Sequence, residues 1–299
     1  MPVKCIAIMS PGDMGNGFGW ALKQQGFDIL TCLAGRGDAT RARAEKSGFR
    51  DVPDLDTLVT EADLVISILP PESAPQLARD IAAAMTRTGK MPAYADCNAV
   101  SPETTRAMAR DIEATGANYI DGGTIGHAPG KSEVPVRIYV SGPRAALMNE
   151  LDGGEISIRV CGETIGDASA VKMCYAGVTK GTNSLHTAAL MTAEALGVRD
   201  ILEREFESSM GAVYQRMKTN VPRLPLDAAR WIGEMEEIAK TFSGAGVTPL
   251  FHEGAREIFQ LLATTSIASE TRETVDTSRT LQDVLQIYTD RLRARETAE

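Results

Sequence analysis

The sequence lacks the features from which membrane-spanning and disulfide-stapled proteins are built. No segment reaches the roughly 20 apolar residues that a membrane helix requires, and the N-terminal MPVKCIAIMS enters a strand-like run without a signal-length apolar region. The five cysteines are odd in number and no two have CxxC spacing, so neither a disulfide framework nor a zinc ribbon is expected. We therefore predict a cytoplasmic protein with reduced thiols and no membrane partner.

Basic residues and histidines are also scarce. Lys and Arg number 31 against 40 Asp and Glu, which gives a formal net charge of -9. A protein that binds the phosphate backbone needs a basic surface, so nucleic acid is not expected as a partner, although a small anionic substrate is compatible with this balance. Because His186 and His252 have no neighbours at metal-ligand spacing, no metal site is predicted.

The sequence does contain an alternation of short apolar runs with helical segments in its first half. Such alternation predicts βαβ units around a mostly parallel sheet, with the strands buried on both faces. The pattern stops near residue 161. The predicted strands cover residues 3–9, 27–33, 63–69, 93–96, 119–120 and 137–140.

Helical patterns replace strands after Gly166. We predict an α/β domain over residues 1–165 and an all-helical substrate and dimerisation domain over residues 166–299, joined by a long interdomain helix. Lys180 either binds an anionic group or is solvated, and the clustered Glu234, Glu236 and Glu237 are expected on a solvated face rather than at a metal site. The predicted helices of this half cover residues 167–196, 200–218, 227–243, 252–264 and 280–294.

The turn after the first strand matches part of a dinucleotide-binding fingerprint. It reads Ser10-Pro11-Gly12-Asp13-Met14-Gly15 between a buried strand and a helix, the context in which G-x-G-x-x-G binds a pyrophosphate. Gly12 and Gly15 keep two of the glycines, Ser10 replaces the first, and the helix N-terminus offers N–H groups to an anion. The turn predicts a Rossmann, doubly wound parallel sheet; a tight turn without a ligand is the alternative.

The end of the second strand favours NADP over NAD. An NAD site usually carries an acid there for the ribose 2′-hydroxyl, whereas here Arg36 directly follows Ala34 and Gly35. A guanidinium can bind a 2′-phosphate through two hydrogen bonds. A solvated surface cation is the alternative role for Arg36, and Asp38 leaves dual specificity open.

Four motifs come in the order found in a known family: the Met14-Gly15 turn, the strand DLVISILP at 63–70, the Asp96-Cys97-Asn98 segment and the Gly122-Gly123 turn. In this order the chain resembles the β-hydroxyacid dehydrogenases, which include 3-hydroxyisobutyrate and 6-phosphogluconate dehydrogenases. The region from about 195 to 265 resembles a 6-phosphogluconate dehydrogenase-like subgroup whose C-terminal domain has no assigned function. The resemblance implies a homodimer.

The same resemblance implies roles for further residues. Two loops are expected to hold the cofactor: Leu69, Pro70 and Pro71 on the adenosine side, and Asn98 near the nicotinamide. Lys172 matches the family's catalytic lysine, because it ends a stretch that begins at Gly162 and has a second glycine at Gly166. It would take the hydroxyl proton as hydride leaves the same carbon, or return it in reduction, with a pKa lowered by burial. A solvent-facing helical lysine is the alternative.

Three departures from the family affect the substrate. Ala176 stands where the family has an asparagine, Ile125 where it has a serine, and Thr179 where 6-phosphogluconate dehydrogenases have an acid. Activity on 6-phosphogluconate itself is therefore doubtful. Tyr175 and Thr179 share a helix face with Lys172 and either contact substrate or pack against other helices. The predicted substrate-binding residues are Thr124, Ile125, Gly126, His127, Tyr175 and Thr179.

These features together predict an NADP-dependent oxidoreductase that transfers a hydride between nicotinamide and a hydroxyacid or sugar acid, with lysine acid/base catalysis. Decarboxylation follows if the product is a β-keto acid. Two alternatives remain open: an imine or ketone reductase on the same scaffold, and a nicotinamide-binding regulatory protein without turnover. The sequence names neither the substrate nor the direction of the reaction.

Overall fold

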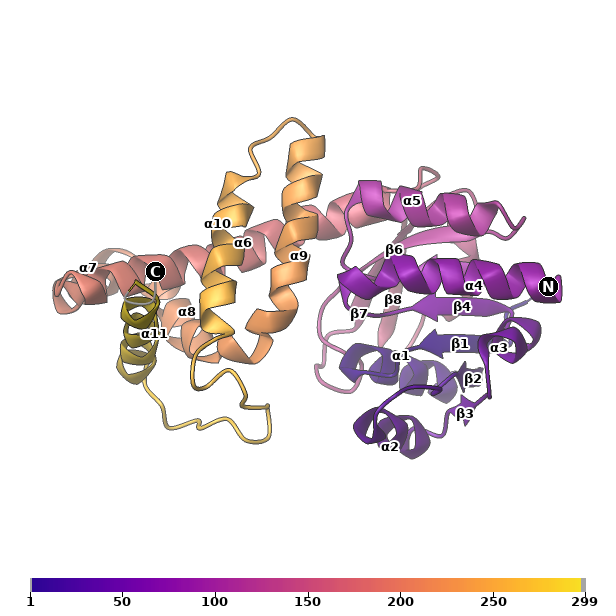
Figure 1. Ribbon diagram of the computed structural model, residues 1–299, viewed down its shortest axis with the longest axis horizontal. Coiled ribbons are helices and arrows are strands. Elements are labelled where there is room, and N and C mark those ends of the chain that lie inside the picture. Colours follow the sequence, from indigo (N-terminus) through magenta and orange to yellow (C-terminus); the bar gives the residue numbers. More distant parts are fainter. Residues whose placement is uncertain (1, 297–299) are drawn as a thin grey trace. The chain divides into compact units, whose positions relative to one another are not determined.

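The computed structural model describes residues 2–296 and divides the chain into two compact units, Met1–Cys174 and Tyr175–Glu299 (Figure 1). The units meet within helix α6 (Asp167–Ala195). The domain boundary predicted at 165/166 lies just before that helix, and the assignment of the whole helix to the second domain stays a prediction.

The first unit is built around a sheet of eight strands in the order β3-β2-β1-β4-β5-β6-β7-β8. All neighbouring strands are parallel except β6 and β7. The predicted α/β class with a doubly wound, mostly parallel sheet is confirmed, whereas β3 and β8 were not predicted. The strands are β1 (Cys5–Met9), β2 (Asp28–Thr31), β3 (Arg50–Asp51), β4 (Leu64–Ser67), β5 (Ala93–Asp96), β6 (Tyr119–Ile125), β7 (Val136–Ser141) and β8 (Ile156–Gly162).

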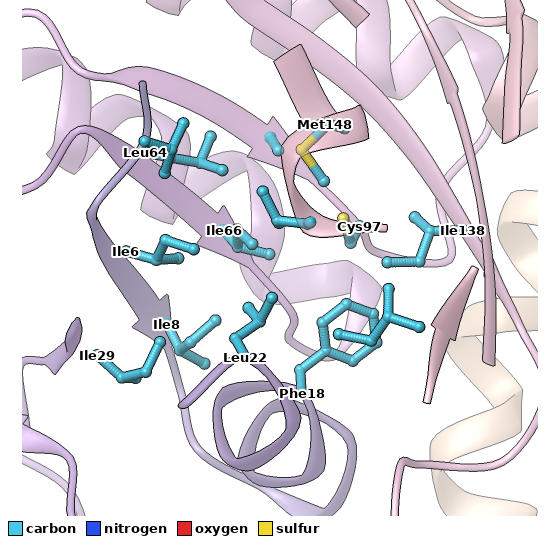
Figure 2. Close-up of a cluster of buried hydrophobic side chains, with 14 of the residues drawn as sticks. Ile6, Ile8, Phe18, Leu22, Ile29, Leu64, Ile66, Cys97, Ile138 and Met148 are labelled. Carbon is cyan, nitrogen blue, oxygen red and sulfur yellow. The ribbon is translucent and has the colours of Figure 1, made fainter. Parts of the chain in front are cut away.

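Helices cover both faces of this sheet because successive strand residues point to opposite sides. Ile6 and Ile8 of β1 pack with Phe18 and Leu22 of α1 (Figure 2), while Ala7 belongs to the cluster formed with α3, α4 and α5. Both faces of the central strands are thus buried, as their continuous apolar runs predict. The helices are α1 (Asp13–Gln24), α2 (Asp38–Lys46), α3 (Leu55–Glu61), α4 (Ala74–Thr88) and α5 (Pro102–Glu113), with 3₁₀ segments η1 (Pro71–Ser73) and η2 (Ala145–Leu151).

The second unit is helical throughout its regular structure. The single helix predicted at 200–218 is interrupted at Met210, whose backbone leaves the helical region with ψ at 34°. In this unit, Trp231 packs edge-on against the buried Phe259, with ring centroids 5.2 Å apart. Besides the rest of α6, the unit contains α7 (Arg199–Ser209), α8 (Gly211–Asn220), η3 (Val221–Arg223), α9 (Pro225–Gly244), α10 (Leu250–Leu262) and α11 (Leu281–Glu296).

Two acidic side chains of α9 lie where the sequence predicted a solvated face. Glu234 is 3% exposed and Glu237 is 7% exposed. Glu234 forms an ion pair with Lys180 of α6 at 2.6 Å. The Lys180 ammonium also lies 5.4 Å from the centre of the Trp231 ring. The prediction of a solvated face was wrong for these two residues: α6 supplies the cation that pairs with Glu234, and Glu237 pairs with Lys240 of its own helix at 2.6 Å.

Candidate functional site

The turn after β1 has the backbone that the dinucleotide fingerprint requires. Ser10 takes a φ of 62°, the only left-handed φ at a non-glycine residue within 2–296. This conformation costs an L-residue roughly 1–2 kcal/mol, and a glycine would adopt it freely. Ser10 therefore fills the first glycine position with its backbone conformation intact.

The two remaining glycines of the turn differ in what surrounds them. A Cβ on Gly15 would lie 2.7 Å from the Ser10 carbonyl oxygen, so this position requires glycine for α1 to pack against the turn. A Cβ on Gly12 would come no closer than 3.9 Å to that same oxygen, so its outer side is open. The open backbone at Gly12 and the first-turn N–H groups of α1 form a surface suited to a diphosphate.

The tip of β2 is fixed by a pair of charged side chains. Arg41 of α2 donates to the Leu33 carbonyl at 2.5 Å and to the Arg36 carbonyl at 3.1 Å, while Asp51 accepts the Leu33 N–H at 2.9 Å. Arg36, in the turn that these contacts hold, lines a cavity of about 390 Å³ next to Met9 and Cys32. Arg41, which the sequence alone did not single out, thus fastens the Arg36 turn.

The cavity beside Arg36 also carries two carboxylates. Asp54 caps α3 by accepting the Thr57 N–H at 2.8 Å, and Asp80 accepts a bond from Gln76 at 2.8 Å. Asp38 begins α2 and is exposed. Arg36 is thus the cation of the cavity lining, and both acids are engaged within their own helices.

Asn98 ties two of the expected cofactor loops together. Its side chain is buried, its Oδ1 accepts the Leu69 N–H, and its Nδ2 donates to Ser67 at 2.7 Å and to Asp96 at 2.5 Å. Leu69 is partly buried, Pro70 is exposed and Pro71 is buried at the start of η1. The amide of Asn98 therefore organises the loops after β4 and β5, and its contact with nicotinamide stays a prediction.

The carboxyl of Asp96 lies at the end of β5 in the same network. Burial raises the pKa of Asp96 to about 7, against the lowering effect of the Asn98 amide. Burial likewise raises the pKa of the neighbouring Cys97 thiol well above its ordinary range. A buried thiol of this kind is a poor nucleophile, so the site offers no cysteine chemistry at this position.

Lys172 is brought against the last part of β6. Its ammonium donates to the Thr124 carbonyl oxygen at 2.6 Å in a partly buried setting, and the Thr124 hydroxyl in turn approaches the Cys97 carbonyl at 3.5 Å. Thr124 is 6% exposed. The structure thus gathers the predicted catalytic lysine, one predicted substrate residue and the loop that carries Asn98.

The glycines that precede Thr124 permit this approach. A Cβ on Gly123 would lie 2.6 Å from the Ala168 carbonyl oxygen and 2.8 Å from the Lys172 Cβ. A Cβ on Gly122 would lie 2.7 Å from the Asp96 carbonyl oxygen. Both positions therefore require glycine, since any side chain would push α6 away from β6 or β6 away from β5.

The other predicted substrate residues are placed differently. Ile125 is buried at the end of β6, while Gly126, with a φ of 128°, and His127 are exposed on the loop that follows. In the second unit, Tyr175 is 49% exposed and the Thr179 hydroxyl bonds to carbonyl oxygens of its own helix. Their roles in substrate binding stay predictions.

The loop between β6 and β7 reaches the turn after β1. Lys131, between β6 and β7, forms an ion pair with Asp13 of the turn, and Gly17 of α1 leaves room for Pro129. The sequence did not reveal this pairing because the two residues lie 118 positions apart.

Among the helices of residues 2–296, none combines the length and the apolar character that a membrane span requires.

Comparisons with known proteins agree with both halves of this arrangement. Residues 5–151 match the family described as the NAD binding domain of 6-phosphogluconate dehydrogenase, and residues 193–262 match a domain of unknown function. An uncharacterized 28.5 kDa protein from Methanothermus fervidus is 27% identical over 236 residues, which are 78% of this chain and 89% of that protein.

Solved structures extend the likeness to the fold. A conserved protein of unknown function, described as structurally similar to 3-hydroxyacid dehydrogenases, has a TM-score of 0.64 and 26% identity, covering 86% of this chain and 96% of its own. A 3-hydroxyisobutyrate dehydrogenase from Mycobacterium tuberculosis, with L-serine, has a TM-score of 0.66 and 20% identity, covering 96% and 99%. At 20% identity, the likeness to the 3-hydroxyisobutyrate dehydrogenase shows a shared fold. The resemblance to the 6-phosphogluconate dehydrogenase-like proteins that the sequence predicted is confirmed by the two family matches.

Proposed function

Because the chain belongs to the proteins that join the NAD binding domain of 6-phosphogluconate dehydrogenase to this C-terminal domain of unknown function, we propose that it is an NADP-dependent oxidoreductase. It acts on the alcohol carbon of a hydroxyacid or sugar acid, or on the corresponding ketone. The observation that carries the proposal is the Lys172 ammonium held 2.6 Å from the Thr124 carbonyl, beside the loop after β5. Cytoplasmic location is part of the proposal.

The residues of the α/β unit fit a dinucleotide. Ser10, Gly12, Asp13, Met14 and Gly15 form the open turn for a diphosphate. The loop of Leu69, Pro70 and Pro71, which Asn98 ties to the loop after β5, lines another side of the proposed cofactor site. The bound cofactor supplies the hydride chemistry.

NADP rather than NAD is proposed from the β2 tip. Arg36 lines the cavity there and Arg41 and Asp51 fix the turn that carries it. A guanidinium pairs with a 2′-phosphate dianion through charge-assisted bonds, which a ribose hydroxyl cannot match. NAD use with lower affinity is the alternative.

Lys172 performs the proton transfer in this proposal. Its Nζ holds a proton toward the Thr124 carbonyl, and a substrate hydroxyl placed within hydrogen-bond reach exchanges a proton with the same atom. Tyr175, Thr179 and the exposed His127 are the proposed groups that orient the rest of the substrate. If the oxidised product is a β-keto acid, loss of carbon dioxide follows.

A homodimer is proposed as the working assembly. In the second unit α6 exposes Val178 and Leu185, each 68% accessible. Residues separated by seven positions share a helix face, so these side chains form an apolar stripe that a second subunit would cover. Sedimentation of the protein and of Val178→Glu tests the dimer, and an unchanged sedimentation coefficient in the variant would count against this face.

The cofactor proposal is tested by titration. NADPH and NADH are titrated against the protein and against Arg36→Ala, with binding followed by nicotinamide fluorescence. We expect NADPH affinity to fall about tenfold or more, which is about 1.4 kcal/mol or more, with NADH affinity unchanged. Arg43→Ala, an exposed cation on the same helix as Arg41, is the matched control. Equal affinities of wild type and Arg36→Ala for NADPH would overturn the specificity assignment.

The catalytic proposal is tested on Lys172→Ala with a panel of hydroxyacids and sugar acids. Turnover is expected to fall by about 10²–10⁴-fold while NADPH affinity stays the same. Full turnover in the variant would remove Lys172 from the mechanism. NADPH binding by wild type without turnover on any member of the panel would favour the regulatory alternative, which the replacements at Ala176 and Ile125 also support.

A further inference from the structure

A single buried carboxylate joins β6 to the first turn of α6. Asp121 is fully buried, and its Oδ2 accepts the backbone N–H groups of Gly166 at 2.9 Å and Ser169 at 3.1 Å. Its Oδ1 accepts the hydroxyls of Ser169 at 2.5 Å and Thr105 at 3.2 Å. These N–H groups belong to the helix terminus, where the backbone has no helical partner to offer.

A serine on β7 supports the same turn from a second direction. The Ser141 hydroxyl donates to Asp121 Oδ2 at 2.9 Å and accepts the Ala168 N–H at 3.0 Å. Three helix-terminal amides, from residues 166, 168 and 169, are therefore held by side chains of the sheet. Because a carboxylate only accepts hydrogen bonds, Asp121 can receive all of these donors without conflict.

This anchor lies within one helical turn of Lys172. Ser169 is three residues before Lys172, and a helix advances 1.5 Å per residue, so a shift of the first turn moves the lysine with it. The close approach at Gly123 leaves no slack between α6 and β6. The place of the Lys172 ammonium against the Thr124 carbonyl is thus set by the same contact that holds the helix terminus.

We propose that Asp121 is the positioning residue of Lys172: its buried carboxylate fixes the start of α6 on β6 and so delivers the lysine ammonium to the Thr124 carbonyl. The functional importance of this contact rests on the proposed function, in which Lys172 transfers the proton. The position of Lys172 follows from the hydrogen bonds of Asp121 whichever function the site has. The predicted strand at 119–120 ended just before Asp121, so the sequence did not single this residue out.

Two substitutions separate this role from simple packing. In Asp121→Asn the carbonyl oxygen can face the Gly166 and Ser169 amides, while the NH₂ group faces the Ser169 and Thr105 hydroxyls, which can accept. The anchor is kept. Asp121→Ala leaves the same amides and hydroxyls buried without the acceptor, so the helix start is released. Thr105→Val is the matched control because it removes one donor without touching α6.

The experiment measures the reactivity of Lys172 itself, without a substrate. Each variant is treated with trace acetic anhydride over a range of pH, and acetylation of Lys172 relative to the exposed Lys4 and Lys90 is read by peptide mass spectrometry. We expect Lys172 acetylation to rise about fivefold in Asp121→Ala, as local opening frees the amine. In Asp121→Asn and Thr105→Val it stays within about twofold of wild type.

Ser141→Ala provides a second way to test the anchor if Asp121→Ala does not fold. It removes the bridge between Ala168 and Asp121 and is expected to raise Lys172 acetylation about twofold to threefold. Wild-type acetylation in Asp121→Ala, or in Ser141→Ala where that variant alone folds, would overturn the inference. So would an equal rise in Asp121→Asn and Asp121→Ala, because the amide would then fail to rescue.

NADPH titration of the same proteins keeps this result apart from the proposed function. All variants are expected to bind NADPH as wild type does, since Asp121 lies outside the cofactor turn. If wild type binds neither NADPH nor NADH, the proposed function fails whatever the acetylation shows. If binding is normal and acetylation does not respond, the inference fails and the proposed function stands.

Discussion

The interiors of the two units handle buried polar groups in different ways. In the α/β unit, Asp121 and Asn98 accept or donate several hydrogen bonds each to backbone and side chains at the ends of strands. In the helical unit, the mostly buried Lys180 pairs with the buried Glu234, which also pairs with Arg230 of its own helix, and the buried His252 has an Nδ1 with no hydrogen-bond partner. The first interior satisfies its polar groups with many hydrogen bonds, whereas the second relies on ion pairs between charged side chains.

The difference shows where each unit uses its polar groups. The network in the α/β unit holds loops and a helix terminus that carry the proposed site, so its geometry is set by many partners at once. The pair in the helical unit joins α6 to α9 and touches none of the proposed cofactor residues. Burying an ion pair stabilises little by itself, but removing one partner leaves a charge without compensation.

The largest effect is expected from breaking the pair in the helical unit. Glu234→Ala should lower the free energy of unfolding of that unit by about 3–5 kcal/mol, because Lys180, whose side chain is 12% exposed, loses its carboxylate partner. The measurement is urea unfolding followed by Trp231 fluorescence in a Trp20→Phe background, since one tryptophan lies in each unit.

The matched control is Glu236→Ala, whose carboxylate is 48% exposed and lies 3.6 Å from Arg256. Its expected cost is within about 0.5 kcal/mol. If both substitutions cost the same, the buried pair is no different from a surface pair and the contrast between the interiors is lost.

A smaller effect is expected from pH in the α/β unit. The pKa of Asp96 rises from 3.8 to about 7 on folding, so the native state holds a proton that the unfolded state releases. Stability from this group is complete below the unfolded pKa and lost as pH rises through the folded pKa, and the loss between pH 5 and 8 is on the order of 3 kcal/mol.

Asp96→Asn should flatten this slope, because the amide does not titrate while its oxygen can still accept the Asn98 bond. Urea unfolding between pH 5 and 8, followed by Trp20 in a Trp231→Phe background, measures it. A slope identical in wild type and variant would show that Asp96 is ionised in the folded protein.

The smallest effect is expected in the helical unit, with the opposite sign. Burial lowers the pKa of His252 below 6.5, so the unfolded state gains a proton before the native state does. Stability from this group is complete above the unfolded pKa and declines as pH falls toward the folded pKa. His252→Phe, which keeps a ring against Phe242, should remove the decline. A decline that survives in His252→Phe, followed by Trp231, would assign it to another group.

The same contrast explains how much the sequence could predict. The β1 turn and the central strands follow from local patterns, since apolar periodicity and the spacing of a turn are properties of neighbouring residues. Lys172 was singled out by the resemblance to a known family. Ser10 could be placed in the first glycine position from its spacing alone. The fold class of the α/β unit therefore followed from the sequence.

The contacts that complete the site join residues far apart in the chain. Asp121 meets residues 45 and 48 positions away, and Glu234 pairs with a cation on another helix. Whether an acid is solvated or buried depends on which element packs over it, which a helix pattern does not specify. Edge strand β8, with several exposed residues, lacked the continuous apolar run that marked the central strands.

The packing under α1 has a consequence for synthesis of the chain. Phe18 and Leu22 share their cluster with Met148 and Leu151 (Figure 2), and Gln25 bonds to the Gly153 carbonyl 128 residues later. The ribosome therefore releases α1 and β1 long before the segment that finishes covering them. Until η2 emerges, the part of this apolar cluster that η2 covers is open to water, and transiently exposed surface of this kind favours aggregation.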